Sequence, residues 1–502
     1  MNSEPAATGS GGRHGRAGAP RVRARTGLVR GWFDLSSWVI DLTPLRVNRQ
    51  YRLLFTGRLI SVFALGMLIV VLSVQTYDLT GSSLQVALVN TVLGLATITG
   101  SLAGGVLADR VDRRRVILVS RALAIAGFVG LALNAGLESP SVAALYVFAV
   151  WDGVTGAVGA TAFGAAVPAV VPRAMLPATG TLMAVCLDLG SAAAPLAGGV
   201  LAARGGAQGV YWAVAAVSLV SWLTLLPLRP IRPGQGCAGE ADPEPPRPRA
   251  AAGSGSPKRR GERLREWGAD LAGGVRFARS EPVVAAVLVM GFLQIFFASP
   301  HVLIPEFVQG HLHAGPEAVG LMYSATSVGA ILATLCSGWV PRVRRVGLVI
   351  VGVYVASGLG IAFFGLAPSV ALAAVAMAAV GAGDVVGEIL RFTVLAERTP
   401  DRLRGRVQSL WTAQVTVGDS LGGPVLSLGA RLIGVGPVIV VGGLVAAVTT
   451  AALLITHPAL RSLTRDRSGD PADRSRPEPV PERDARDRPG SDPATDNPQN
   501  PT

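Results

Sequence analysis

Long apolar runs are the feature that most limits what this chain can fold into. We read twelve such runs, rich in Ala, Val, Leu and Gly, and each has the length of about 20 residues that a helix needs to cross a bilayer core. Only 15% of the residues are charged, against about 25% in an ordinary soluble domain, and the mean hydropathy is +0.47. A soluble protein can bury one or two such runs, but not a dozen. The runs are expected to be helices at residues 53–76, 84–108, 115–135, 142–167, 177–202, 209–228, 283–305, 317–340, 346–366, 369–391, 407–429 and 433–456.

One long gap divides the twelve runs into six and six, which is typical of a two-half helical transporter. We therefore expect an all-α integral membrane protein with twelve transmembrane helices in two pseudo-symmetric six-helix bundles. Five regions are predicted along the chain: a basic tail at 1–50 with a short amphipathic segment (32–45), a first bundle at 51–228, a central loop at 229–282 with a surface helix at 258–279, a second bundle at 283–456 and an unfolded tail at 457–502.

The basic residues give the orientation. The net charge is +13, Lys258 is the single lysine, and the arginines gather in alternate joints between the runs rather than on one face, which argues against nucleic-acid binding. Because cytoplasmic loops carry the excess of Lys and Arg, this alternation predicts a multi-pass protein of the cell membrane with both termini in the cytoplasm. The first 30 residues have no apolar core, so no cleavable signal peptide is expected. Three cysteines are an odd number, and two of them lie in apolar runs, so no disulfide framework is expected.

A dense group of charges separates the second run from the third, in the stretch GGVLADRVDRRR at 104–115. Its glycines allow close approach to a neighbouring helix. Asp109, at the end of the second run, can meet the positive N-terminal end of a facing helix. The arginines at 113–115 can contact the anionic inner leaflet and hold the loop inside.

The stretch Gly105-Val-Leu-Ala-Asp109-Arg110-Val-Asp-Arg113-Arg114 resembles the signature loop G-x-L-A-D-R-x-G-R-R of the major facilitator superfamily. It departs from that pattern at Asp112, where the family prefers Gly. The resemblance implies that this loop is a latch between two halves that holds the outward-facing state. The equivalent stretch after the eighth run keeps a glycine and basic residues but has Arg342 in place of the acid, so a second latch would be degenerate.

The fifth run carries Gly190-Ser-Ala-Ala-Ala194-Pro195, which resembles the small-residue and proline pattern of proton-coupled exporters in the superfamily. The eleventh run repeats it as Gly418-x-x-x-Gly422-Gly423-Pro424. Small residues allow close packing, and Pro195 and Pro424 interrupt the helical hydrogen bonds and predict bends. The fourth run has Trp151-Asp152-Gly153 in place of the arginine motif of drug exporters, which argues against a multidrug-type proton relay.

Stretches in order from residue 37 to about 456 resemble the enterobactin exporter family; they are Ser37-Trp-Val-Ile-Asp-Leu, Arg58-Leu-Ile-Ser-Val-Phe-Ala-Leu-Gly, Gly-Gly-Val-Leu-Ala-Asp109-Arg, Trp151-Asp-Gly and Gly405-Arg-Val-Gln-Ser-Leu-Trp411-Thr-Ala-Gln414. The resemblance implies a secondary active transporter that exports a siderophore from the cytosol, by proton antiport with alternating access. Related macrolide exporters share part of the pattern, so macrolide or multidrug efflux is the alternative. A transport-inactive membrane sensor or scaffold is a third hypothesis, against which the intact loop and the central acids argue.

Three acids, Asp152, Asp188 and Asp419, fall near the middle of the fourth, fifth and eleventh runs. A charge at the bilayer centre costs about 2.5–3.5 kcal/mol on insertion scales, so these carboxylates should face the bundle interior or water, or carry protons. We interpret one or more of them as exchanging a proton during transport. The alternative interpretation is a structural acid that is hydrogen-bonded to backbone or to a polar neighbour.

Other polar residues within the runs are further candidates. Asp384, Glu388 and Arg391 have helical spacing and are interpreted as a charge cluster near the cytoplasmic gate. Arg58 can extend to the membrane surface or pair with an anionic substrate. The polar and aromatic side chains expected in the substrate cavity, which can also simply pack, are Gln294, Trp411, Gln414 and Trp151.

No enzyme, metal or cofactor is predicted. The sequence contains no phosphate loop of the G-x-x-x-x-G-K type and no nucleophile–base set. His311 and His313 are the only closely spaced histidines, and two ligands make a poor metal site. The predicted partners are a small-molecule substrate, protons and membrane lipid, and the protein is expected to be a monomer.

Overall fold

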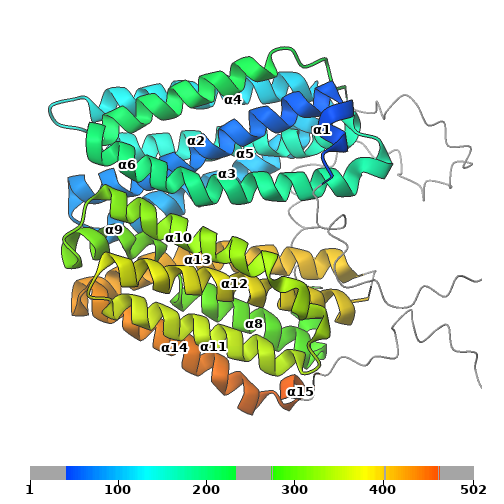
Figure 1. The fold of residues 1–502 in the computed structure, drawn as a ribbon, viewed down its shortest axis with the longest axis vertical. Helices are drawn as coiled ribbons and strands as arrows, with labels where there is room; N and C mark the ends of the chain where they lie inside the picture. Colours follow the sequence, from blue (N-terminus) through cyan, green and yellow to red (C-terminus); the bar gives the residue numbers. More distant parts are fainter. Residues whose placement is uncertain (1–40, 233–272, 274, 401–402, 462, 464–502) are drawn as a thin grey trace, which may run out of the picture. The chain divides into compact units, whose positions relative to one another are not determined.

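A computed structural model of the chain describes residues 41–232, 273, 275–400, 403–461 and 463, and α-helices account for nearly all of them (Figure 1). The α-helices are α1 (Thr43–Val47), α2 (Arg49–Thr80), α3 (Ser83–Arg110), α4 (Arg113–Ala135), α5 (Val142–Val170), α6 (Leu176–Leu225), α8 (Pro282–Phe297), α9 (Ile304–Glu306), α10 (Pro316–Leu335), α11 (Val346–Leu366), α12 (Val370–Arg398), α13 (Arg404–Ile433), α14 (Val435–Thr456) and α15 (Pro458–Arg461). Short 3-10 or π turns are η2 (Arg173–Met175), η3 (Pro300–Leu303), η4 (Phe307–His311) and η5 (Ser337–Arg342).

Ten helical segments of the described residues are long and apolar enough to cross a membrane. The fifth and sixth expected spans form one continuous element, α6, in which Gly206 alone leaves helical geometry (φ 64°, ψ −178°). That left-handed conformation suits glycine because it has no Cβ, so Gly206 divides α6 into two helical stretches. The eleventh expected span corresponds to α13, which has 30 residues but carries Arg404, Arg406, Asp419 and Arg431.

The expected span at 283–305 is α-helical only in its first part. Helix α8 ends at Phe297, and 3-10, α and π turns continue to His311. Pro300 and Pro305 explain the interruption, since proline lacks the N–H that an α-helix needs and restricts the residue before it.

Some expected features lie partly or wholly outside the described residues. The surface helix expected at 258–279 is described only at residues 273 and 275–279, where it is helical. Of the amphipathic segment expected at 32–45, only residues 41–45 are described, and α1 begins there at Thr43. The tail expected at 457–502 begins with α15, where Leu460 is buried and its carbonyl oxygen lies against Gly347.

The helices pack in two groups, which we call the N-terminal helices (α2–α6) and the C-terminal helices (α8–α14). Figure 1 shows each group lying together. Packing repeats between the groups: α2 contacts α6 as α8 contacts α13, α3 contacts α5 as α10 contacts α12, and α4 contacts α6 as α11 contacts α14.

Glycines determine where the helices within a group approach most closely. A Cβ atom added at Gly100 of α3 would lie 2.7 Å from the carbonyl oxygen of Val154 in α5. In the second group, a Cβ added at Gly381 of α12 would overlap the carbonyl oxygen of Thr326 in α10. These helices can therefore touch backbone to backbone only because no side chain intervenes, as in other membrane helix pairs.

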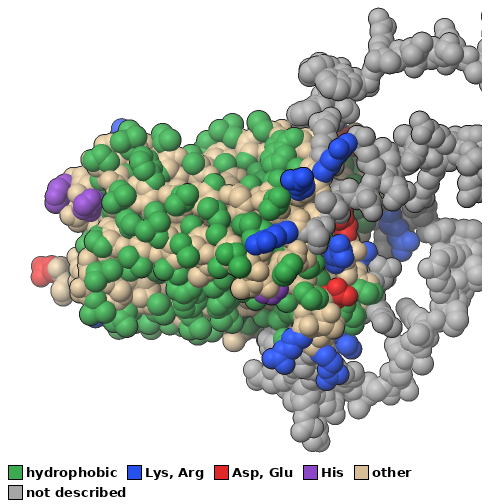
Figure 2. Space-filling view, turned by 90° about the horizontal axis from the view of Figure 1, so that it is seen from below, with side chains coloured by type: hydrophobic (Ala, Val, Ile, Leu, Met, Phe, Trp, Pro, Cys, Tyr) green, Lys and Arg blue, Asp and Glu red, His purple; other side chains and the backbone are tan. Residues whose placement is uncertain are grey.

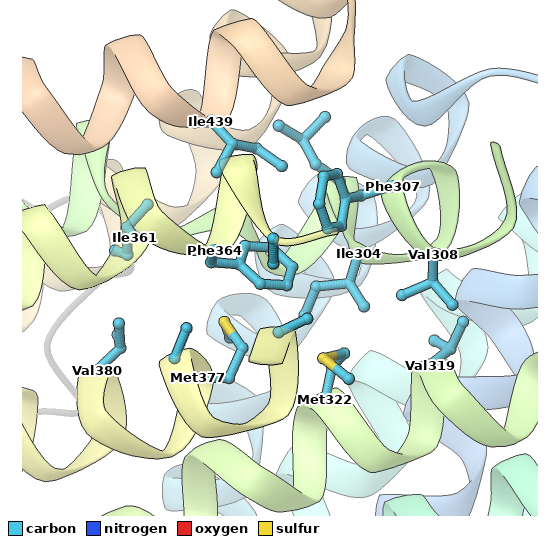
Figure 3. Packing of buried hydrophobic residues seen from close by; sticks show 14 of the residues in the cluster. Ile304, Phe307, Val308, Val319, Met322, Ile361, Phe364, Met377, Val380 and Ile439 are labelled. Carbon is cyan, nitrogen blue, oxygen red and sulfur yellow. The ribbon is translucent and has the colours of Figure 1, made fainter. Parts of the chain in front are cut away.

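A cluster of buried apolar side chains packs between the C-terminal helices near α9. Figure 3 shows its aromatic centre, where the rings of Phe307 and Phe364 lie with centroids 4.6 Å apart. Met322 of α10 and Met377 of α12 pack against them. Val70 and Val74 of α2 join the same cluster, so this core connects the two groups of helices.

The outer surface has the distribution expected of a protein in lipid. Exposed apolar side chains follow one face of α14 at Val441, Leu444, Val448 and Ile455. Figure 2 shows hydrophobic side chains over most of the flank, with basic side chains gathered toward one end. Because water cannot be the solvent for so continuous an apolar flank, the described helices form a multi-pass membrane protein.

Candidate functional site

The two ends of the helices differ in charge. The joints at 110–114, 226–232, 344–345 and 398–406 each carry at least two arginines, and we call this the arginine-rich end. The joints at 81–82, 136–141, 204–209 and 298–315 lie at the other end, which we call the arginine-poor end. Helices from the two groups meet at the arginine-poor end.

Helices α6 and α10 meet directly across the two groups. The backbone N–H of Leu196 donates to Ser324 Oγ at 3.0 Å. A Cβ added at Gly199 would lie 2.5 Å from the carbonyl oxygen of Pro316, and one added at Gly320 would overlap that of Pro195. Pro195 therefore lies in the contact between the groups as well as inside α6, and the expected small-residue pattern provides the close approach.

Helices α3 and α13 form a second contact. Thr91 Oγ1 donates to the carbonyl oxygen of Ser420 at 3.0 Å, and Arg431 Nη2 donates to Ser82 Oγ at 2.7 Å. Pro424, one turn from Ser420, lies inside α13. Thr91, Arg431 and Ser82, which is the N-cap residue of α3, lie toward the arginine-poor end.

The loop expected to be a latch is bound to its own half. Arg113 Nη1 donates to the carbonyl oxygen of Ala165 at 2.9 Å, and Arg114 Nη2 donates to that of Leu226 at 2.8 Å. Asp109 and Arg110 are exposed at the end of α3, and a Cβ added at Gly105 would meet no atom within 4 Å. The described geometry thus places the motif on the N-terminal helices and the segment that follows α6.

Asp112, where the sequence departs from the family pattern, has a local function that the sequence analysis missed. Its Oδ1 accepts from the backbone N–H of Arg114 at 2.9 Å, which caps α4, and from that of Ile231 at 2.9 Å. The N–H of Arg113 returns a bond to the carbonyl oxygen of Ile231 at 3.0 Å. The capping preference of Asp before a basic helix start could have indicated the first bond, but nothing in the sequence indicates Ile231.

Replacement of Asp112 by glycine should destabilise the N-terminal helices although it restores the family residue. Loss of the N-cap to glycine costs only a few tenths of a kcal/mol, but the change also leaves the N–H of buried Ile231 without its acceptor, which costs about 1–3 kcal/mol. Thermal unfolding in detergent should show a lower Tm than that of the wild type. Asp109→Asn is the matched control, since Asp109 is exposed at the same loop, and an equal Tm for both variants would contradict the assignment.

Two arginines and one acid gather in the N-terminal helices. Asp152 on α5 interacts electrostatically with Arg121 on α4, and Arg121 also with Arg58 on α2. The Arg58 guanidinium carbon lies 5.6 Å from the centroid of the Phe163 ring. Arg121 was missed by the sequence analysis, although a lone arginine inside the expected span 115–135 was a usable signal. The structure thus gives Asp152 a cationic neighbour.

Trp151 belongs to α5, and its side chain packs against α4. Its indole Nε1 donates to the carbonyl oxygen of Leu123 at 2.7 Å, and its ring covers Gly127. The side chain is 41% exposed. This geometry gives Trp151 a packing role, beside any contact that it makes with substrate.

Asp188 and Asp419 are both exposed, and neither carboxylate accepts a hydrogen bond among the described contacts. Asp188 precedes Pro195 by seven residues, so it lies two turns along the same face of α6 that contacts α10. Asp419 directly precedes Ser420, the residue that accepts from Thr91. Both acids therefore lie next to the contacts between the two groups of helices.

The acid of α12 belongs to a chain of hydrogen bonds. Gln294 Nε2 of α8 donates to Ser357 Oγ of α11 at 3.1 Å, and that hydroxyl donates to Asp384 Oδ1 at 2.7 Å. Gln294 and Ser357 are 5% and 2% exposed. Gln294, expected in the cavity, and Asp384, expected in a gate cluster, thus lie together.

Arg391 is buried among neutral partners. Its Nε donates to the carbonyl oxygen of Val287 at 3.2 Å, and Nη1 donates to Tyr354 Oη at 3.1 Å. The guanidinium carbon lies 4.3 Å from the ring centroid of Trp411. With its amide turned so that the oxygen faces the guanidinium, Gln414 accepts from Nη2 at 2.6 Å. Arg391 therefore joins α8, α11, α12 and α13.

The three residues of the charge cluster expected on α12 have separate surroundings in the structure. Asp384 binds Ser357, Arg391 binds Tyr354, and Glu388 is exposed. Space for the guanidinium depends on Gly291, since a Cβ there would overlap it. The sequence spacing correctly placed these residues on one helix, but their partners come from α8, α11 and α13.

No group of three or more His, Cys, Asp or Glu side chains in the described parts of the chain could hold a metal ion. His311 stacks on Phe307 with ring centroids 5.1 Å apart. The polar groups that the structure brings together are therefore single carboxylates and guanidinium groups on membrane-spanning helices, which suit the binding and release of a solute or a proton.

Two solved transporter structures have a similar fold. The chain is similar to the nucleoside transporter NupG, with a TM-score of 0.61 and 15% identity over 82% of this chain and 99% of that one. It is similar also to a POT family transporter in complex with 5-aminolevulinic acid, with a TM-score of 0.63 and 14% identity over 82% of this chain and 97% of that one. At these identities the likeness concerns the fold alone.

Sequence relatives are more similar. The enterobactin exporter EntS of Citrobacter koseri is 35% identical over 398 residues, which are 79% of this chain and 89% of the relative. EntS of Shigella boydii is 34% identical over 397 residues, with the same coverage. The family model of the Major Facilitator Superfamily matches residues 54–423 and 301–490. The chain therefore belongs to the major facilitator superfamily and is a multi-pass membrane transporter, not an enzyme.

Proposed function

We propose that this protein exports a siderophore from the cytosol across the cell membrane by proton antiport. The observation that carries the proposal is the similarity to enterobactin exporters along 79% of the chain at 35% identity. The cargo would be enterobactin or a siderophore of similar chemistry. Its entry and exit would use the space between the N-terminal and C-terminal helices.

The proposal includes twelve transmembrane helices in two six-helix bundles, at 51–228 and 283–456, in a monomer. Counting α6 as two spans divided at Gly206, and α13 as one, gives six spans on each side of the central loop. The repeated packing of α2 with α6 and α8 with α13 supports two related halves. The arginine-rich end would be cytoplasmic, because cytoplasmic loops carry the excess of Arg.

Alternating access follows from this orientation. The contacts of α6 with α10 and of α3 with α13 would close the extracellular side, so the described conformation would be open to the cytoplasm. The two halves would then rock about a central site and separate on the outside. Release of the 110–114 loop from the segment at 226–232 would let it meet the C-terminal helices in the other conformation.

Export is tested by deleting the gene in its host and measuring siderophores in the medium by mass spectrometry. Loss of one siderophore from the medium, with its accumulation in the cells and rescue by the intact gene, is the expected result. Unchanged siderophore secretion together with sensitivity to macrolides or other drugs would contradict the proposal and favour drug efflux.

Proton coupling predicts that at least one of Asp152, Asp188 and Asp419 is essential for accumulation. One proton moving down 100 mV supplies about 2.3 kcal/mol, which sustains a roughly 50-fold gradient. In inverted membrane vesicles with iron-free enterobactin as the probe, an Asp→Asn variant that cannot exchange the proton should lose most of this gradient. Full accumulation by all three single variants would contradict a coupling role for these acids.

A further inference from the structure

The turn η3, which follows α8, presents one exposed side chain at the place where the two groups of helices meet. The turn packs against both α3 and α13. A Cβ added at Gly423 of α13 would lie 3.3 Å from Val302 of the turn and 3.6 Å from Ala87 of α3. Of the four residues of η3, Pro300 and Leu303 are buried, Val302 is half-buried and His301 is exposed. A turn enclosed by helices of both groups therefore leaves a histidine accessible.

His301 lies well inside the arginine-poor end. Its imidazole packs on the ring of Tyr323 in α10, with centroids 5.8 Å apart and planes inclined by 34°. The Tyr323 hydroxyl is hydrogen-bonded to Ser73 of α2, so the pair lies between the two groups. Ser73 precedes Thr80, the last residue of α2, by seven residues, which places this level about 10 Å below that end of the helix.

The outward side of this level is filled. Ile304, Phe307 and Val308, which follow η3 toward the arginine-poor end, are fully buried in the apolar cluster of Figure 3. Val74, the neighbour of Ser73 on its outward side, belongs to the same cluster. The exposed surface of His301 therefore faces the space between the two groups, on the side that opens toward the arginine-rich end.

Two contacts fix the imidazole and leave its other edge available. Ser299 Oγ lies 3.1 Å from Nδ1, and Tyr323 Oη donates to the backbone carbonyl oxygen of His301 at 2.8 Å. Within the described residues, Nε2 makes no hydrogen bond. The ring thus offers an aromatic face, on the side away from Tyr323, and one nitrogen that can share a hydrogen bond with a hydroxyl group. An aromatic ring that carries a hydroxyl matches both features.

We propose that His301 binds a catechol ring of the cargo. The catechol stacks on the free face of the imidazole, and one of its hydroxyl groups forms a hydrogen bond with Nε2. Sites for small molecules commonly combine aromatic surfaces with a few fixed polar groups in this way. The inference rests on the proposed siderophore export and deepens it, because it names the chemical group of the cargo that this part of the protein recognises.

The test measures binding of iron-free enterobactin to the full chain in nanodiscs by isothermal titration calorimetry. His301→Ala removes both the ring and its nitrogen, and we expect the Kd to rise about tenfold or more. His301→Phe keeps a ring on Tyr323 but has no Nε2, so it should recover part of the affinity. His313→Asn is the matched control, because His313 is exposed in the loop before α10 and asparagine tolerates its positive φ of 51°. Its Kd should equal that of the wild type.

The hydrogen bond is tested with a second ligand, the benzoyl analogue of enterobactin, which has the same rings without hydroxyl groups. The wild type should prefer enterobactin, and this preference should fall about threefold or more in His301→Phe. A general disturbance of the fold would weaken both ligands alike and leave the preference unchanged. The comparison of the two ligands therefore decides the assignment even if His301→Ala lowers the Tm.

The outcomes separate the inference from the proposed function. A Kd of His301→Ala within about twofold of the wild type, or an unchanged preference in His301→Phe, would overturn the catechol site and leave siderophore export intact. A wild-type protein that binds neither ligand would instead overturn the proposed cargo, and the catechol site with it.

Discussion

Replacement of Gly199 by alanine is expected to lower export about tenfold while the protein remains folded in the membrane. The new Cβ would lie 2.5 Å from the carbonyl oxygen of Pro316, in the contact between α6 and α10. Because the obstacle is backbone, the helices must separate, and overpacking of this kind costs about 1–3 kcal/mol. The cost falls only on the conformation in which these helices touch, and each 1.4 kcal/mol or so changes an equilibrium about tenfold.

The expected mechanism is a shift away from the conformation closed at the arginine-poor end. A single cysteine at Thr91, which faces Ser420 in this contact, should react faster with an impermeant maleimide from outside in the Gly199→Ala background than in the wild type. Gly320→Ala, on the opposite side of the contact, should act in the same direction, because its Cβ would overlap the carbonyl oxygen of Pro195.

Gly205→Ala is the matched control, since it lies on α6 but its Cβ would meet no atom within 4 Å. Its export and labelling should equal those of the wild type. If Gly199→Ala exports normally, or if Gly205→Ala is equally impaired, the contact between α6 and α10 does not control access to the site.

Replacement of Gly381 by alanine is expected to cause a large loss of stability in the C-terminal helices. The Cβ would overlap the carbonyl oxygen of Thr326, where α12 crosses α10. Neither backbone can move without opening the contact, so we expect a loss of about 1–3 kcal/mol, which exceeds the roughly 1 kcal/mol that alanine gains over glycine in helix propensity. A lower Tm in detergent and a smaller monodisperse fraction on size-exclusion chromatography would measure the effect.

The control is Gly352→Ala on α11, where an added Cβ meets no atom within 4 Å. Here the gain in helix propensity acts alone, so the Tm should stay equal or rise slightly. A Tm for Gly381→Ala at or above that of Gly352→Ala would show that α10 and α12 do not depend on this glycine.

Much of the fold could be predicted because the signals are local. Hydrophobic runs placed the helices well: the expected 346–366 matches α11 at Val346–Leu366, and the expected 142–167 falls within α5 at Val142–Val170. The interruption after Phe297 was not predicted, although Pro300 and Pro305 lie there. The sequence stays apolar after Phe297, so hydropathy does not show where the α-helix changes to 3-10 and π turns.

The candidate site could be predicted only in part. The residue types and helices were identified, but Arg391 was grouped with Asp384 and Glu388 by spacing, whereas it binds Tyr354 and lies over Trp411. Arg121 was passed over, although it is the charged neighbour of Asp152. Spacing along one helix reports which side chains share a face, but not which neighbouring helix that face meets.

The sequence by itself determined the membrane-spanning helices, the arginine-rich end and the glycines and prolines that allow close packing, since each depends on composition and short-range periodicity. The tertiary structure alone decided that Gly199 meets Pro316, that Asp112 holds Ile231 and that Gln294 reaches Asp384 through Ser357. The physical reason is that such pairs depend on the depth and rotation of helices that are far apart in the chain. Those quantities are set by the sum of many backbone and side-chain contacts rather than by any one segment.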